Sequence, residues 1–131
     1  MPVRSRITTK GFAEYLERLA KAGKDIDAIS GRALTAGGEI LLSGMQKRAP
    51  KDTHNLESHL AVEGPHQDGN LIYVEVGLAK DTDADTARYG NVQEYGSART
   101  QAQPYVRPTL DEDMGKARQA MRAVFEDEDV L

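Results

Sequence analysis

The chain has 131 residues, 39% of them hydrophobic and 29% charged, which predicts one globular domain over 1–131 with a single core. It has no cysteine, which excludes disulfides and thiolate metal ligands, and its net charge of −4 argues against a protein whose main role is to hold nucleic acid. No stretch approaches the roughly 20 apolar residues of a membrane helix and no signal peptide is evident, so we expect a soluble, cytosolic protein.

Two helices are predicted in the N-terminal part of the chain. Apolar residues from Phe12 to Leu19 recur at i, i+3, i+4 and i+7, the spacing of one helix face, over 10–22. A longer apolar stripe predicts a second helix over 25–48, which ends before Pro50 because the residue preceding a proline avoids the helical conformation. Glycines inside this helix each cost about 1 kcal/mol relative to alanine, which is tolerable where another element packs closely against the backbone.

The hydrophobic pattern then changes from helical to alternating. Alternation over 56–63 and again over 70–78 predicts two strands, joined into an antiparallel hairpin by the turn GPHQDGN at 64–70. The polar stretch 79–88 is expected to be a loop. Residues 89–107 are expected to be irregular or briefly extended.

A last helix completes the predicted fold. Pro108 suits its first turn, and apolar residues from Leu110 to Phe125 form its buried stripe. The order of elements predicts an α+β fold, in which a small antiparallel sheet is covered on one face by the long helix of the N-terminal half and by the C-terminal helix.

The charges are distributed unevenly between the two ends. Residues 1–24 carry six Lys/Arg against two Glu, whereas residues 111–131 carry three Lys/Arg against seven Asp/Glu. We expect a basic N-terminal arm over 1–9 and an acidic tail over 126–131 that frays into solvent. Such runs are usually solvated surface, but the basic end of one copy could also meet the acidic end of another copy or of a partner.

The acidic repeat Asp81-x-Asp83-x-Asp85 has the spacing that opens a calcium-binding loop. An EF-hand loop also needs a glycine at its sixth position and a bidentate glutamate at its twelfth, and these positions are Thr86 and Val92 here. We therefore expect a solvated, mobile loop instead of a calcium site.

The three histidines, His54, His59 and His66, lack the spacing of a zinc site. On a strand, His54 and His59 would point to opposite faces, so a metal-dependent hydrolase built on these two with Glu57 is the weakest alternative. Ser97 has no evident base, and no phosphate-binding loop is present. We expect no catalytic residue, no metal and no cofactor, and a protein that acts by binding and assembly.

The stretch EYGSARTQAQPYVRPTL at 94–110 is unusually rich in tyrosine and proline. Pro104 and Pro108 fix φ and remove two backbone donors, and Gly96 permits a sharp bend, which predicts a stiff, non-helical arm. Aromatic residues and arginine are enriched in interface cores. The arm carries Tyr95, Tyr105, Val106 and Arg107.

Two interpretations of this arm stay open. Tyr105 and Val106 either contact neighbouring subunits or only seal the C-terminal helix against the sheet. For Arg107 we expect an ion pair with Glu94, which would lock the polar loop at 97–103.

Two segments together resemble a known family. RAPKDTHNLESHL at 48–60 and ARYGNVQEYGSARTQAQPYVRPTLDE at 87–112 follow a long helix and precede a terminal one. In this order they resemble the tail-component, or head–tail joining, proteins of long-tailed bacteriophages and prophages. His54 and Glu57 depart from the family pattern, which usually has glycine and a basic residue there. The positions that carry the resemblance are Pro50, Thr53, Leu56, Tyr89, Glu94, Tyr95, Gly96, Pro104 and Pro108.

The resemblance spans about residues 10–125 and implies a non-enzymatic structural protein of the phage neck. Copies would form a homo-oligomeric ring, expected as a hexamer in the virion and as a monomer in isolation, that completes the tail and joins it to the head. The ring would lie between the head-closure protein and the tail terminator or tail tube, around a channel that DNA crosses without specific binding. The expected location is the virion neck, after assembly in the host cytoplasm and without a membrane.

Candidate contacts with neighbouring subunits or rings lie in the loop at 97–103 and at the hairpin tip at 64–70, because loops held at both ends are natural places for such contacts. The alternative function is a small cytosolic adaptor or regulator that binds one protein partner through 94–110. The expected interface residues are His66, Gln67, Asp68, Ser97, Arg99, Gln101, Tyr105 and Arg107.

Overall fold

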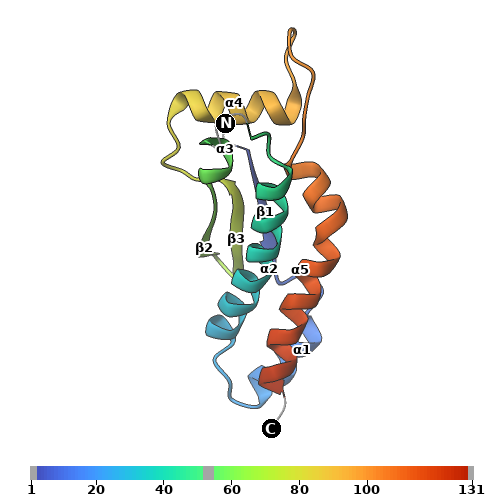
Figure 1. Cartoon of the computed structure of the whole chain (residues 1–131). Coiled ribbons are helices and arrows are strands. Elements are labelled where there is room, and N and C mark those ends of the chain that lie inside the picture. Colours follow the sequence, from blue (N-terminus) through green and yellow to red (C-terminus); the bar gives the residue numbers. More distant parts are fainter. Residues whose placement is uncertain (1–2, 52–54, 130–131) are drawn as a thin grey trace.

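The computed structural model describes residues 3–51 and 55–129 and confirms an α+β fold. Figure 1 shows an elongated molecule, with α4 and the loop that follows it at one end and α1 and the C-terminus at the other. The elements in chain order are β1 (Arg4–Thr8), α1 (Ala13–Lys21), α2 (Ile26–Arg48), α3 (Asn55–Ser58), β2 (Leu60–Asp68), β3 (Leu71–Leu78), α4 (Ala84–Tyr95) and α5 (Val106–Asp129).

The sheet is antiparallel, with the strand order β1-β3-β2. The predicted hairpin is confirmed, and a third strand that the sequence did not reveal, β1, pairs with β3 so that Ile7 lies opposite Val74. Only two of the residues from 3 to 8 are buried, Val3 and Ile7, and this stretch is too short for its alternation to be distinguished from chance. The basic N-terminal arm is therefore, from residue 4 to residue 8, an edge strand.

The hairpin differs from the prediction at both ends of β2. Residues 55–58 form the short helix α3 instead of a strand, and β2 begins only at Leu60. Leu56 and Leu60 are both buried, so the helical turn leaves the apolar positions of the predicted strand in the core. At the other end, the pairing continues through the predicted turn. Glu63 lies opposite Glu75 and His66 opposite Tyr73, so Gly64 and Pro65 form a bulge between these two pairs. A proline has no backbone N–H, and at a bulge it therefore removes no hydrogen bond from the strand pairing.

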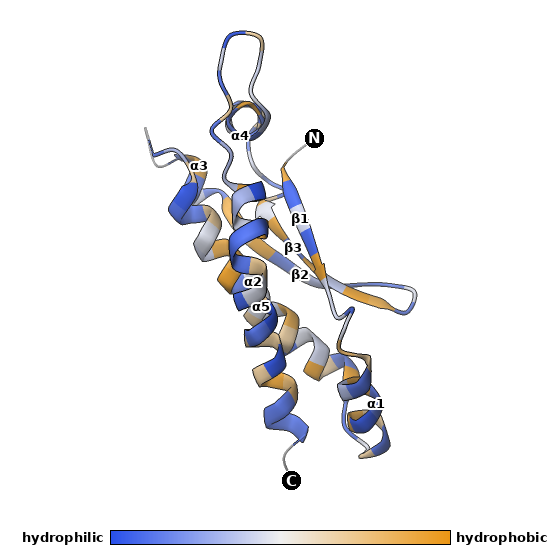
Figure 2. Ribbon diagram, turned by 90° about the vertical axis from the view of Figure 1, so that its right-hand side faces the viewer, coloured by the Kyte–Doolittle hydropathy of each residue, from blue (hydrophilic) through white to orange (hydrophobic). Residues whose placement is uncertain are grey.

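One face of the sheet is covered by α2 and α5, which run antiparallel and side by side (Figures 1 and 2). The glycines of α2 lie where other elements approach its backbone. A Cβ on Gly38 would lie 3.0 Å from Val62, and one on Gly44 would lie 2.8 Å from the Thr109 methyl group. The close packing predicted to offset the low helix propensity of these glycines is therefore present.

Helix α4 corrects two predictions, because the expected loop at 79–88 extends only from 79 to 83 and the chain over 89–95 is helical instead of irregular. Asp83 begins the helix as its N-cap, and its carboxylate accepts a hydrogen bond of 3.0 Å from the Thr86 N–H, which lowers the pKa of Asp83. The sequence did not predict this helix because the positions that it buries include Thr86, Gly90, Gln93 and Glu94 instead of an apolar stripe. Within the described ranges, no group of three side chains is arranged to hold a metal ion.

The acidic C-terminal segment does not fray, since α5 continues to Asp129. Asp129 forms an ion pair of 2.9 Å with Arg18, Glu126 accepts a hydrogen bond of 3.0 Å from the Tyr15 hydroxyl, and Glu128 pairs with Arg32. The basic and acidic ends thus meet within one chain. None of the helices in the described part of the chain is both long and apolar enough to cross a membrane.

Candidate functional site

Glu94 joins α4 to the first turn of α5. Its carboxylate oxygens accept hydrogen bonds from three successive backbone N–H groups, at 2.9 Å from Tyr105, 2.8 Å from Val106 and 3.0 Å from Arg107. These are donors that a helix N-terminus leaves without a partner, and a negative charge there is favoured by the helix dipole. Glu94 therefore caps α5 from another helix.

This capping replaces the expected ion pair between Glu94 and the Arg107 side chain. The carboxylate binds the backbone of Arg107, and the Arg107 side chain is exposed. The expected outcome, a locked loop between Gly96 and Pro104, is reached by a different contact.

Tyr105 and Val106 belong to the core. Tyr105 is completely buried and its hydroxyl donates a hydrogen bond of 3.2 Å to the Gly90 carbonyl. Burial raises the pKa of this hydroxyl, and the nearby Glu94 raises it further. The two residues therefore pack inside the chain at the start of α5, as in the second interpretation of the arm. Tyr105 is completely buried and cannot contact a neighbouring subunit.

The loop between α4 and α5 projects from the end of the molecule (Figures 1 and 2). Gly96 turns the chain with φ of +78°, and a Cβ there would lie 3.1 Å from the Thr100 carbonyl, so only glycine fits without strain. The Gln103 N–H closes the loop base with a hydrogen bond of 2.7 Å to the Gln93 carbonyl. The result is a closed loop with a fixed base.

The loop tip is ordered and exposed. The Ser97 hydroxyl accepts hydrogen bonds from the N–H groups of Arg99, at 3.3 Å, and of Thr100, at 3.1 Å. Ser97, Arg99 and Gln101 are all exposed, as expected of interface residues. Tyr95, at the loop base, is 74% exposed, which is a large aromatic surface left uncovered.

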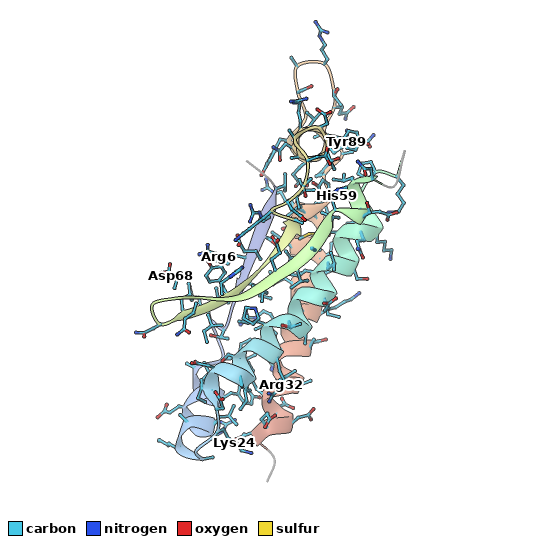
Figure 3. All side chains as sticks on the ribbon, turned by 90° about the vertical axis from the view of Figure 1, so that its left-hand side faces the viewer. Arg6, Lys24, Arg32, His59, Asp68 and Tyr89 are labelled. Atoms are coloured by element: carbon cyan, nitrogen blue, oxygen red, sulfur yellow. The ribbon has the colours of Figure 1, made fainter. Side chains whose placement is uncertain are left out.

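The hairpin tip lies apart from this loop, as Figure 3 shows for Asp68. Gln67 and Asp68 are exposed, whereas His66 is half-buried between the Tyr73 ring and Glu75, with 3.9 Å between its Nε2 and the carboxylate. The two predicted contact regions therefore lie in different parts of the molecule, the loop at one end and the hairpin tip at the side (Figures 2 and 3), and cannot form one site within a single chain.

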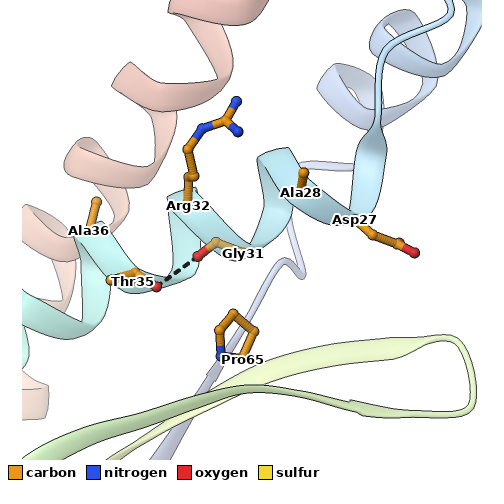
Figure 4. Close-up of a pocket in the computed structure, with 7 residues that line it drawn as sticks. All are labelled: Asp27, Ala28, Gly31, Arg32, Thr35, Ala36 and Pro65. Carbon is orange, nitrogen blue, oxygen red and sulfur yellow. Dashed lines mark hydrogen bonds between the residues drawn. The ribbon is translucent and has the colours of Figure 1, made fainter.

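A shallow apolar groove of about 610 Å³ lies between the N-terminal half of α2 and the bulge of β2. Figure 4 shows the Pro65 ring beneath the helix, facing Gly31. A Cβ on Gly31 would lie 3.1 Å from the Pro65 ring, so the glycine keeps the groove open. This groove could not be predicted from the sequence, because it brings Gly31 against Pro65, 34 positions later in the chain. It is lined by Asp27, Ala28, Gly31, Thr35, Ala36 and Pro65, with Arg32 at its rim.

The remaining positions of the resemblance are structural. Leu56 is buried, and Pro50 and Tyr89 are half-buried. Pro108 lies in the first turn of α5 as predicted, and Pro104 is exposed just before it. Thr53 lies outside the described residues.

The residues of the hydrolase alternative have other contacts. Glu57 forms an ion pair of 2.9 Å with Lys51, and the His59 Nδ1 lies 2.8 Å from the Asn55 carbonyl. His54 lies outside the described residues. Glu57 and His59 thus serve the local structure around α3.

Arg48 was not singled out from the sequence, yet it joins the two long helices. Its guanidinium contacts the Asp113 carboxylate at 2.7 Å and the Thr109 hydroxyl at 3.1 Å, and it also pairs with Glu112. This contact also favours the ionised form of Asp113, because the hydrogen bond from Arg48 lowers the pKa of the Asp113 carboxyl.

Comparison with known families identifies the chain. The model of the family described as "Bacteriophage HK97-gp10, putative tail-component" matches residues 10–96, more than half of the chain. The matched part runs from α1 to the end of α4 and includes Glu94 and Gly96. No curated protein and no solved structure matches the chain.

Proposed function

Because the chain belongs to the HK97-gp10-like family of bacteriophage tail components, we propose that it is a neck protein that completes the tail and joins it to the head. The family match is the observation that carries this proposal, and it agrees with the resemblance of the two motif segments. In this role the chain is a structural protein of the virion and performs no catalysis.

The geometry supports assembly through several surfaces. The loop at 97–103 and the hairpin tip at 64–70 project from different parts of a body that α2 and α5 stiffen along its length (Figure 1). A subunit with two unlike contact surfaces can form a closed ring when each copy offers one surface to the next. We propose a ring of identical copies between the head-closure protein and the tail terminator or tube.

The charge of the chain is compatible with a channel for DNA. A lining rich in Lys and Arg would hold phosphates and release counterions, which would slow the passage of DNA. The net charge of −4 and the ion pairs that engage Arg18, Arg32 and Arg48 leave fewer free cations for such binding.

The adaptor alternative is less well supported. It needs the tyrosine-rich segment at 94–110 as a recognition surface, but Tyr105, Val106 and Glu94 are buried within the chain. Within this segment, the part from Tyr95 to Pro104 and the Arg107 side chain are left at the surface to bind a partner.

Deletion of the gene from the phage or prophage that encodes it tests the proposed function. Lysates of the deletion should contain filled heads and separate tails by electron microscopy, and the wild-type gene supplied in trans should restore joined particles. Normal virions in the deletion, or absence of the protein from purified wild-type virions, would rule out the proposal.

A further inference from the structure

We propose that the loop at 97–103 of one copy, together with Tyr95, binds in the apolar groove between α2 and Pro65 of a second copy. This contact rests on the proposed function, because it supplies the two unlike surfaces that a ring requires. Its occupant is a second copy of this chain, and the following observations support that choice.

The groove and the loop cannot meet within one chain. Gly31, in the groove, lies 17 residues before Arg48 on the same helix, which corresponds to about 25 Å at 1.5 Å per residue. Arg48 marks the end of α2 that contacts the start of α5, through Thr109. The loop has seven residues with a closed base, so it reaches at most about 12 Å from that base. Figures 1 and 2 both show it directed away from α2.

The two surfaces match in chemistry. The groove lining includes small apolar groups, among them the methyls of Ala28 and Ala36 and the Pro65 ring. The loop region offers the Ala98 methyl and, at 74% exposure, the Tyr95 ring. An aromatic ring that enters an apolar groove is the kind of contact that dominates interface energies.

The charges of the two surfaces are also opposite. Arg99 is the only charged residue of the loop at 97–103, and within the described part of the chain its guanidinium has no partner. Asp27, on the groove rim, likewise has no ion pair among the described residues, and Asp68 is exposed on the adjoining hairpin. Arg32, the other charge at the rim, is already paired with Glu128.

The loop is also prepared for binding. Its tip is held by the Ser97 hydroxyl and its base by the Gln103 N–H and by Glu94, so little conformational freedom remains to be lost on association. A surface that is already ordered binds with a smaller entropic cost.

Because the chain has no cysteine, disulfide cross-linking can test this contact without background. Two full-length variants, Ala98→Cys and Ala28→Cys, are mixed at about 1 mM, where a contact with a millimolar Kd is still substantially populated. After mild oxidation, mass spectrometry of the linked peptides identifies which cysteines paired. Ser43→Cys is the matched control for the groove cysteine, since Ser43 is exposed on the same helix about 22 Å away.

We expect a link between positions 98 and 28 at about five times the yield of the link between 98 and 43, as electrostatic complementarity directs the encounter. Arg99→Glu in the first variant should reduce this yield about fivefold, and Asp27→Arg in the second should restore it. Equal yields at 28 and 43 would overturn the proposal, and the groove would then be free to bind a different tail protein. Failure of Asp27→Arg to restore the yield would overturn the pairing of Arg99 with Asp27.

This result is separate from the fate of the proposed function. A specific link together with normal virions after gene deletion would refute the neck role and keep the contact. A deletion that separates heads from tails, without a specific link, would refute the contact and keep the neck role.

Discussion

Replacing Glu94 should lower the free energy of unfolding more than replacing an exposed residue of the protein does. Glu94 is only 8% exposed, and its carboxylate caps three N–H groups at the start of α5. A hydrogen bond to a charged group contributes about 1.5–3 kcal/mol, and its loss is greatest where the donor stays buried. Arg107 is exposed, so water can reach its N–H, whereas Tyr105 and Val106 are buried.

We therefore expect Glu94→Ala to lower the free energy of unfolding by about 3–4 kcal/mol, mostly from the two buried donors. Glu94→Gln should cost about 1.5–2 kcal/mol, because its carbonyl can still accept from the two buried donors while the charge and the second acceptor are lost. Against a total stability of about 5–15 kcal/mol, both changes are large enough to measure.

Urea unfolding followed by circular dichroism measures these differences. With a slope of about 2 kcal/mol per molar urea, Glu94→Ala should lower the midpoint by roughly 1.5–2 M. Glu39→Gln is the matched control, since Glu39 is exposed on α2, and its effect should stay within about 0.5 kcal/mol. If Glu94→Ala costs no more than this control, the carboxylate does not hold α5 in the way described.

Three further predictions concern the contacts between elements. Gly44→Ala should lower the free energy of unfolding by about 1–3 kcal/mol, because the added methyl overpacks against α5. Gly115→Ala, with open space at its Cβ, should stabilise α5 by about 0.5–1 kcal/mol, and equal effects of the two changes on the urea midpoint would contradict the close approach at Gly44. The lowered pKa of Asp113 means that its ion pair with Arg48 contributes stability above the unfolded pKa of about 3.9 and loses it as the pH falls through the folded value. Asp113→Asn should therefore differ most from wild type near pH 7 in thermal unfolding, and a constant difference down to pH 2 would contradict this linkage. Tyr105→Phe should cost about 1 kcal/mol through loss of the hydrogen bond to the α4 backbone. It should also remove from the ultraviolet pH titration a tyrosine that ionises above the usual range, because burial raises the pKa of Tyr105; loss of a tyrosine that ionises in the usual range would contradict this burial.

Most of the regular elements could be predicted from the sequence because each buries one face whose period is local. The stripes of α1, α2 and α5 and the alternation of the hairpin strands report burial within a single element. The family resemblance also followed from the sequence, since the two motif segments keep their order and spacing, and the family match confirms it.

Other features depended on partners that are distant in the sequence. Helix α4 buries polar residues and glycine, so its helical character follows from the cap at Asp83 and from the contact of Glu94 with α5, not from an apolar stripe. The charged ends were predicted as a frayed tail and a basic arm, but Arg18 and Asp129 meet across a separation of 111 residues.

The sequence by itself thus determined the fold class, the two long helices, the hairpin and the family. The tertiary structure alone decided that Tyr105 is a core residue, that Glu94 binds backbone instead of a side chain, and that Gly31 and Pro65 form a groove. The physical reason is the distance along the sequence over which each feature is determined. Periodicity records which side of one element avoids water, whereas caps, ion pairs and grooves require two segments whose relative position is fixed only when the core packs.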